Sequence, residues 1–420
     1  ALMPKAGHGA ATPLGRWSLC GRAHASSTLA CRYGQNERNG TLLSMPHSPD
    51  PVTRYKELVA VAQSVQRDNL VLLTASDYSH RELVANWAAH AHRQRVHNYV
   101  VLAMDRPMAR TLAQWCVPSF DNTANIQGWQ RSRLWPLARV MLERVLAGSA
   151  LLMTGLDVLY IDVDCLILHD FRPFLASLKL VDIVTQRDVY PANAAGQFAS
   201  LANALFDGTV PLSVDGVVRW SSCTGFMLFR SSAGSVRFMD DVLALANSNF
   251  FHTNAVDQVG LNEALRAWEW KPSFLHEYSY ARRSTRPAPR TMEDMLVIGK
   301  LQGWPDEACA SHTPRPKCSE TLVRCSSKPT AKRPCLTFGL LPYRLFPRDA
   351  NWSAVRRDAL VMHGLKTERL ATGSPRNKIS ALKRHGLWQE LREVRMPRTA
   401  FDASSHRCRT RRTDHSVHAP

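Results

Sequence analysis

The sequence lacks an apolar run long enough to cross a membrane, since a spanning helix needs roughly 20 such residues. The best run, Val145 to Leu156, ends at the charged Asp157. No signal-like apolar segment is visible, and the sequence opens with Ala1. We therefore expect membrane attachment only through an anchor absent from this sequence, and composition leaves the cellular location open.

Cysteine is scarce, with 10 in 420 residues, which excludes a small disulfide scaffold. Four of these lie in one stretch rich in proline, lysine and arginine: Cys309, Cys318, Cys325 and Cys335. Their spacings do not fit a zinc site. We expect at least one disulfide among them, formed in an oxidising lumen, and the alternative is unpaired thiols in a cytosolic loop.

A single basic helix or an aromatic-studded basic strand is also missing, although the formal net charge is +18. Arginines are interleaved with acids along the chain, whereas nucleic-acid-binding modules gather them on one helix or strand. The charge favours polyanions in general, including phosphorylated small molecules. Nucleic-acid binding is therefore kept only as a less favoured alternative.

The order of apolar segments predicts an α/β fold. Two short apolar runs flank a helical segment, as in a parallel βαβ unit. Further strands and one more helix follow at intervals along the chain. The predicted strands cover residues 69–74, 98–104, 157–161, 181–185, 224–230 and 359–363, and the predicted helices residues 83–94 and 131–146. We expect a mostly parallel central sheet with helices on both faces.

Composition divides the chain into three parts. Residues 1 to about 50 lack apolar periodicity and indicate a stem or linker, which we extend to residue 66, just before the first predicted strand. A single catalytic domain is expected over residues 67–395, with a Cys/Pro-rich insertion at about 278–335. Residues 396–420 are rich in arginine and predict a disordered basic tail.

Two carboxylates follow the apolar run that ends at Ile161. Asp162 and Asp164 are two residues apart, so a turn after the strand lets both converge on one cation. Hard oxygen ligands of this kind suit Mg²⁺ or Mn²⁺ bound to phosphates. The alternative is a solvated acidic strand end, but open α/β sheets bind ligands at this end of their strands.

The sequence resembles a nucleotide-diphospho-sugar transferase family of plants and algae, which includes arabinosyl- and xylosyltransferases. The segments that carry the resemblance keep their order and spacing from about Asn69 to Trp388. They are NLVLLTASDYSHRELVANWAAH, NYVVLAMD, GLDVLYIDVDCLILHDF, DIVTQRD, CTGFMLFRSS, AVDQVGLNEAL, LLPYRLFP and ALVMHG.

The resemblance implies a GT-A fold, a Mn²⁺ or Mg²⁺ cofactor, a UDP-sugar donor and transfer with retention. The acceptor is expected to be a glycan or glycoprotein in the Golgi lumen, with no nucleic-acid partner. By the family pattern the metal ligands are Asp162, Asp164 and His363, and the catalytic pair is Asp257 and Gln258. The donor-binding residues are Thr74, Ala75, Ser76, Asp105, Asp162, Thr224, Gly225 and Lys378.

Other interpretations of single residues stay open. His363 fits a structural buried histidine as well as a ligand, and Asp257 fits a helix cap. Cys223 stands where the family pattern has asparagine, which leaves a sugar contact in doubt. A catalytically inactive nucleotide-sugar-binding relative is therefore the main alternative. If His363 binds the metal, its ring should face the Asp164 carboxylate across about 4 to 6 Å.

Overall fold

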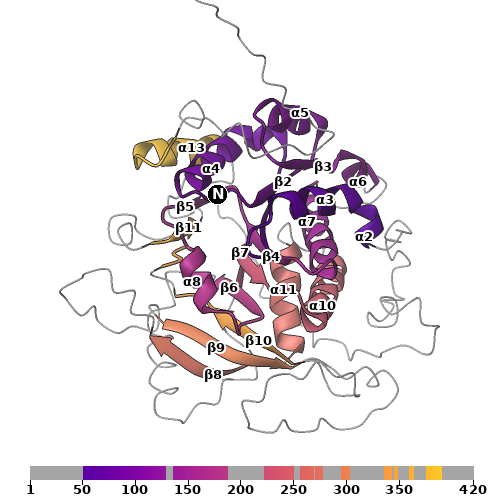
Figure 1. Ribbon diagram of the computed structural model, residues 1–420, viewed down its shortest axis with the longest axis vertical. Coiled ribbons are helices and arrows are strands. Elements are labelled where there is room, and N and C mark those ends of the chain that lie inside the picture. The colour runs from indigo at the N-terminus through magenta and orange to yellow at the C-terminus, as the bar shows by residue number, and fades with distance from the viewer. Residues whose placement is uncertain are drawn as a thin grey trace, which may run out of the picture.

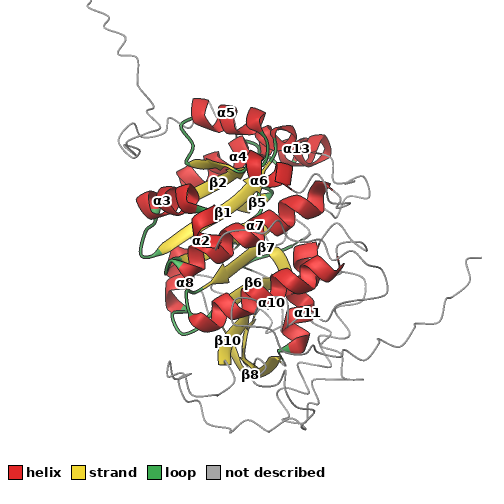
Figure 2. Ribbon diagram, turned by 90° about the vertical axis from the view of Figure 1, so that its right-hand side faces the viewer, coloured by secondary structure: helices red, strands yellow, loops and turns green. Residues whose placement is uncertain are grey.

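A computed structural model describes residues 51–128, 136–187, 222–249, 256–268, 270–277, 295–302, 335–342, 345–348, 359–363 and 375–389. These residues form a layered α/β structure in which helices cover both faces of one large sheet (Figures 1 and 2). None of the described helices is long and apolar enough to span a bilayer.

The central sheet has nine strands in the order β3-β2-β1-β4-β7-β6-β10-β9-β8. All point in one direction except β7 and β9, which pair antiparallel with both neighbours. The strands are β1 (Leu70–Ser76), β2 (Tyr99–Ala103), β3 (Ser119–Asp121), β4 (Asp157–Ile161), β6 (Ile183–Arg187), β7 (Ser222–Phe229), β8 (Trp270–Glu277), β9 (Met295–Gln302) and β10 (Cys335–Leu340). The expected mostly parallel sheet is therefore confirmed.

Each face of the sheet has its own core, because successive strand residues point to opposite sides. In β1, Val71 and Leu73 pack in one core while Leu70 and Leu72 pack in the other. The first core includes side chains from α3 (Lys56–Val65), α7 (Pro136–Met153), α10 (Ala233–Asn249) and α11 (Val256–Ala267). The second includes side chains from α4 (Arg81–Arg93), α5 (Arg106–Gln114) and α8 (Arg172–Ser177).

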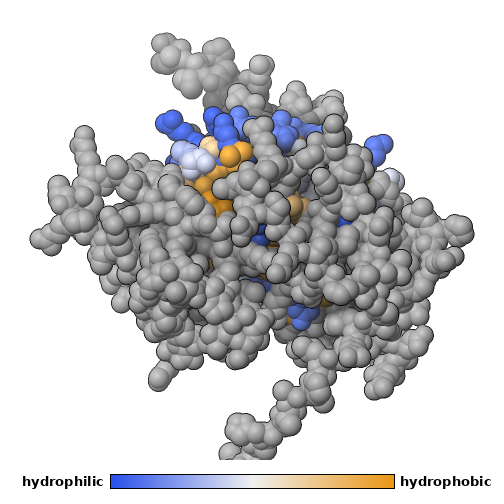
Figure 3. Space-filling model, turned by 90° about the horizontal axis from the view of Figure 1, so that it is seen from below, coloured by the Kyte–Doolittle hydropathy of each residue, from blue (hydrophilic) through white to orange (hydrophobic). Residues whose placement is uncertain are grey.

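Few large apolar side chains of the described residues are exposed. Those exposed among the described residues are Tyr78, Leu137, Met153 and Leu180. In the view from below, hydrophilic residues border a small apolar area on the described surface (Figure 3). Burial of the apolar strand faces therefore accounts for the layered arrangement.

Helix α7 ends in a turn at Gly155, and β4 begins directly after this turn. Helix α7 continues past the predicted end at residue 146 to Met153. Gly155, with φ +92, then closes a Schellman turn in which Gly155 N donates to Leu152 O and Leu156 N to Leu151 O. A left-handed residue favours glycine here. The apolar run at 145–156 is thus mostly helix, and β4 begins only after the turn.

The last strand does not join the central sheet. β11 (Val361–His363) pairs antiparallel with β5 (Cys165–Ile167) in a separate two-stranded sheet. Strand β5 follows the Asp162–Asp164 segment directly. The predicted strand at 359–363 therefore exists, and it lies beside the motif segment as expected, but in a small sheet of its own.

Parts of the predicted linker and of the predicted insertion belong to the folded α/β structure. The residues before position 67 include α2 (Pro51–Arg54) and α3, and Tyr55, Leu58 and Ala62 from this region are fully buried in the first core. The segment predicted as an insertion contains β9, which is part of the central sheet. Cys309, Cys318 and Cys325 lie outside the described residues, as do residues 1–50 and 396–420, so the disulfide and tail predictions stay predictions.

Candidate active site

The two motif aspartates occupy a tight turn at the end of β4. Asp162 N donates to Gly225 O at 2.8 Å, which continues the pairing of β4 with β7, and Cys165 N donates to Asp162 O at 2.9 Å. This turn brings both carboxylates to one side, as the spacing predicts. Their side chains remain partly accessible, with Asp162 26% exposed and Asp164 14% exposed.

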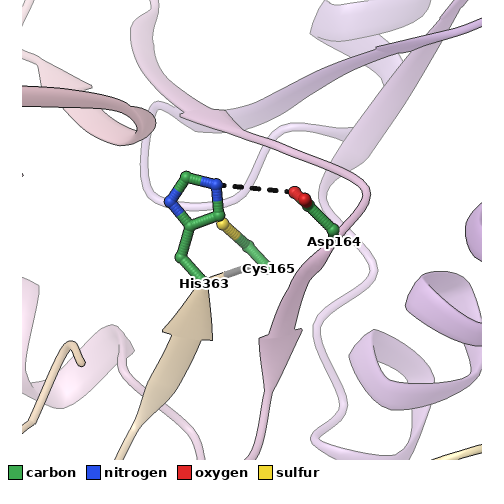
Figure 4. A group of neighbouring side chains, drawn as sticks. All are labelled: Asp164, Cys165 and His363. Carbon is green, nitrogen blue, oxygen red and sulfur yellow. Dashed lines mark ion pairs between the residues drawn. The ribbon is translucent and has the colours of Figure 1, made fainter. Parts of the chain in front are cut away.

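His363 completes the group from a segment about 200 residues later. Its register partner is Cys165, so the pairing of β11 with β5 carries the ring to the motif turn. His363 Nε2 lies 3.5 Å from Asp164 Oδ1 (Figure 4). It also lies 3.5 Å from Asp162 Oδ2. The separation is shorter than the 4 to 6 Å expected, because the imidazole and carboxylates contact each other directly.

Gly225 leaves room for the His363 ring. A Cβ atom added at Gly225 would lie 2.0 Å from His363 Cε1 and 2.5 Å from Nε2. Contacts this short do not occur between non-bonded atoms, so any larger residue must displace the ring. The His363 ring therefore explains why this position of the family pattern is a glycine in this chain.

Three side chains surround the other ring nitrogen and the ring edge. His363 Nδ1 lies 3.0 Å from Gln186 Oε1 and 3.2 Å from Cys223 Sγ. Cys165 Sγ donates to Gly225 O at 3.0 Å. The ligand atoms of Asp164, Cys165 and His363 all lie within 4.8 Å of one another, so these residues could also hold a metal ion.

Arg144 links the motif to the predicted catalytic pair. This residue of α7 is 3% exposed, and its Nη1 donates to Asp162 Oδ1 while its Nη2 donates to Asp257 Oδ2. Asp257 also accepts from Gln258 N at 2.8 Å through its Oδ1. Asp257 is 3% exposed at the start of α11, so the helix carries its carboxylate into the site rather than into solvent.

Lys378 reaches the same group from α13 (Pro375–Arg384), where its Nζ donates to Asp164 Oδ2. The helix rests on α4 through a small core that includes Leu83, Ala381 and Leu382. Lys378, predicted to bind donor phosphates, therefore lies on a motif carboxylate in this structure. Five of the predicted site residues thus converge: Asp162, Asp164, Asp257, His363 and Lys378.

The cluster holds strongly interacting charges. Burial opposes ionisation of Asp162, but Arg144 and His363 outweigh it and lower the pKa of Asp162 to about 2. Burial likewise opposes ionisation of Asp164, and Lys378 and His363 hold its pKa well below the usual value. For His363, burial disfavours the cation, whereas the surrounding thiols and carboxylates raise its pKa well above the usual value. The carboxylates are therefore ionised and available to a cation at neutral pH.

The remaining predicted donor residues lie along strand ends, and two of them are used internally. Asp105 caps α5, accepting from Met108 N at 2.8 Å and from Tyr78 N at 3.0 Å. Ser76 Oγ donates to Asp77 O. Thr74 is fully buried, and its Oγ1 has no hydrogen-bond partner among the described residues. Ala75 is the penultimate residue of the same strand, and Thr224 is buried in β7 beside Gly225.

Sequence reasoning missed Arg144 and Gln186. Arg144 follows Glu143 with apolar residues on both sides in α7, and two adjacent charges there are a signal, because buried charges must be paired. Gln186 is the penultimate residue of β6, and an uncharged amide near a strand end gives no comparable signal. Its contact with His363 depends on where β11 lies.

The mostly parallel sheet with helices on both faces is consistent with a GT-A fold. The family model for nucleotide-diphospho-sugar transferases matches residues 94–318, more than half of the 420 residues. This chain therefore belongs to the nucleotide-diphospho-sugar transferase family.

Single relatives match more weakly. The Arabinosyltransferase XEG113 of Arabidopsis thaliana is 26% identical over 126 residues, which are 29% of this chain and 19% of that protein. The chain thus matches about a fifth of the length of this relative.

Three solved glycosyltransferase structures match this chain at low TM-scores. The bifunctional glycosyltransferase WbbM has a TM-score of 0.33 at 11% identity, over 46% of this chain and 37% of WbbM. The galactosyltransferase LgtC, solved with donor and acceptor sugar analogues, has a TM-score of 0.31 at 13% identity, over 46% and 70%. Mouse xyloside xylosyltransferase 1 has a TM-score of 0.28 at 13% identity, over 46% and 80%.

Proposed function

We propose that this protein is a metal-dependent glycosyltransferase that moves a sugar from a UDP-sugar to a glycan or glycoprotein, with retention at the anomeric carbon. The observation that carries the proposal is the convergence of Asp162, Asp164 and His363 in a chain of this family. Nothing local brings His363 to the motif, so its proximity reflects the folded site. The proposed location is the Golgi lumen.

The side chains present fit a divalent cation. Two carboxylates and an imidazole nitrogen offer oxygen and nitrogen ligands of the kind that Mn²⁺ accepts. His363 carries a proton while no metal is bound, because the surrounding thiols and carboxylates raise its pKa. Metal binding would displace that proton and leave the three negative charges of Asp162, Asp164 and Asp257 against the two positive charges of Arg144 and Lys378. The remaining negative charge favours a cation. A bound cation would neutralise the diphosphate as it leaves the sugar.

The other charged residues have distinct proposed roles. Arg144 fixes Asp162 and Asp257 relative to each other, because a planar guanidinium binds two carboxylates in a set geometry. Asp257 and Gln258 are proposed to bind sugar hydroxyls beside the reacting carbon. Lys378 is proposed to leave Asp164 and bind the donor phosphates, since its flexible stem lets the ammonium move.

Nucleotide binding without turnover is the second candidate. Cys223, which replaces the asparagine of the family pattern, lies beside His363 rather than facing away from the site. The change therefore falls where it could affect chemistry. Measuring turnover separates the two candidates.

The test is a panel of nucleotide sugars incubated with the purified protein and Mn²⁺. We expect release of UDP from one or a few UDP-sugars, abolished by EDTA and restored by Mn²⁺. Asp162→Asn and Asp164→Asn variants, checked for folding by circular dichroism, are the controls. UDP binding without release would support the inactive relative. Metal-independent binding to RNA or DNA that falls steeply with salt, with no UDP binding, would contradict both candidates.

A further inference from the structure

Gln186 has a fixed amide orientation at the end of β6. Its Nε2 donates to Phe346 O at 2.8 Å and to Pro347 O at 3.0 Å. Rotating the amide by half a turn would place its oxygen against two carbonyl oxygens, which cannot donate. The side chain is fully buried, so water cannot replace these bonds. The amide nitrogen must therefore face the two carbonyls.

This orientation determines what His363 meets. With the Gln186 nitrogen committed, its Oε1 faces His363 Nδ1 at 3.0 Å and can only accept a hydrogen bond. Nδ1 must then carry a proton. When the ring is neutral, as a metal ligand must be, a proton held on Nδ1 leaves Nε2 as the nitrogen that can offer a lone pair. Nε2 is also the atom that faces Asp162 and Asp164.

Cys223 cannot set this choice. Its Sγ lies 3.2 Å from His363 Nδ1, but it also accepts from Gly225 N at 3.3 Å. A thiol both donates and accepts, and it does so weakly, so it is compatible with either tautomer. The fixed acceptor at Nδ1 is the glutamine.

We propose that Gln186 is a positioning residue that holds His363 as its Nδ1–H tautomer and so directs Nε2 to the metal. The carbonyls that orient it come from the segment leading to β11: His363 N donates to Pro347 O at 3.0 Å. Pro347 O thus contacts both the histidine backbone and the glutamine amide. Gln186 on β6 therefore contacts both the 346–347 segment and the proposed metal ligand His363. The inference rests on the proposed metal site.

The test compares Gln186→Leu, Gln186→Glu and Cys223→Ala with the wild-type protein. Leucine removes the acceptor, a protonated glutamic acid keeps an acceptor and one donor, and alanine removes the other neighbour of Nδ1. We measure the Mn²⁺ affinity by electron paramagnetic resonance. The tautomer of His363 in the Mg²⁺-bound protein is read from ¹⁵N NMR of labelled histidine, with His363→Gln assigning the signal.

We expect Gln186→Leu to weaken Mn²⁺ binding by about 10- to 100-fold, as loss of a ligand's outer hydrogen bond does elsewhere. The Nδ1–H signature should disappear in that variant, return in part in Gln186→Glu and persist in Cys223→Ala. An unchanged signature in Gln186→Leu overturns the inference, even if stability falls, because Gln186 would then only support the fold. An unchanged Mn²⁺ affinity overturns it as well. If the wild-type protein binds no Mn²⁺ even with UDP, the metal site itself fails, and the inference fails with it.

Discussion

Two neighbouring residues of α7, Glu143 and Arg144, carry buried charges that face different surroundings. Glu143 is fully buried and accepts from Arg54, from the Tyr55 hydroxyl and, at 3.2 Å, from Asn122 Nδ2. Arg144 is 3% exposed and binds Asp162 and Asp257. One helix thus positions two charge clusters that differ in composition.

The difference separates a structural cluster from a site. The Glu143 cluster pairs one carboxylate with one guanidinium and two neutral donors, and it attaches α2 to α7. The Arg144 cluster has three carboxylates, and one of them, Asp162, is 26% exposed. A balanced, enclosed pair supports folding, whereas several carboxylates beside a histidine that can lose its proton, one of them accessible, are suited to binding an ion.

The largest effect is expected at the enclosed pair. Glu143→Ala leaves the Arg54 guanidinium, which is 10% exposed, without its carboxylate. Removing one partner of a buried ion pair costs about 3 to 5 kcal/mol, so the free energy of unfolding should fall by that amount. Urea unfolding followed by circular dichroism measures it. The turnover per folded molecule should not change, and a selective loss of turnover would show that the two clusters are coupled.

A large effect on catalysis is expected at the neighbouring residue. Arg144→Met removes the bridge between Asp162 and Asp257, and we expect UDP release to slow by about 10²- to 10³-fold, the usual cost of losing one charge-stabilising group. Arg144→Lys, which keeps the charge but not the fork, should be intermediate. Steady-state rates of UDP release decide this. Normal turnover in Arg144→Met would assign Arg144 to the same structural class as Glu143.

A smaller effect is expected from moving a ligand without removing any charge. In Gly225→Ala the new Cβ would meet the His363 ring at 2.0 Å, so the ring must shift. We expect Mn²⁺ affinity to fall by about 10- to 100-fold, comparable to loss of a ligand's support. Gly128→Ala is the matched control, because a Cβ there has nothing within 4 Å. Equal Mn²⁺ affinities in both variants would contradict the site geometry.

The smallest effect is expected at a half-exposed pair that belongs to neither cluster. The Asp77 carboxylate forms a hydrogen bond with the His80 ring and accepts another from the Ser79 hydroxyl. These two bonds, the first more than the second, lower the pKa of Asp77 to about 2. A depressed carboxyl pKa stabilises the fold above the unfolded pKa near 4, and this contribution is lost as the pH falls through about 2. Asp77 is 41% exposed, so solvent screening keeps the contribution below about 1 kcal/mol.

The measurement for this pair is the unfolding free energy of wild type minus that of Asp77→Asn. The difference should be positive at pH 5 and shrink toward pH 2. A difference that does not vary with pH would mean that the Asp77 carboxylate contributes nothing through its charge.

Local pattern predicted much of the fold, and resemblance predicted much of the site. Apolar runs located β1, β2 and β4, because buried parallel strands are continuous apolar segments. The end of α7 was misplaced, because an apolar run does not distinguish helix from strand before Gly155 is recognised as a terminator. β9 was missed, because it lies between segments rich in proline and charge.

The site residues that were not predicted, Arg144 and Gln186, reach the site through contacts between segments far apart in the sequence. The spacing of Asp162 and Asp164 predicted them as cation ligands, and the family pattern added His363. The contacts of Arg144 and Gln186 depend on how α7 and β6 pack against later segments, which the local sequence does not encode. Asp105 shows the reverse case: a carboxylate predicted to bind the donor is used to cap α5.

The most direct test of the account is a Mn²⁺ titration followed by electron paramagnetic resonance, with and without UDP. It compares the wild-type protein with the Asp162→Asn/Asp164→Asn double variant. The account predicts one bound Mn²⁺ per wild-type chain in the presence of UDP and none in a double variant that is still folded. Equal Mn²⁺ binding by both proteins, or UDP binding that does not change with Mn²⁺, would contradict the proposal that these carboxylates form the cation site of a nucleotide-sugar transferase.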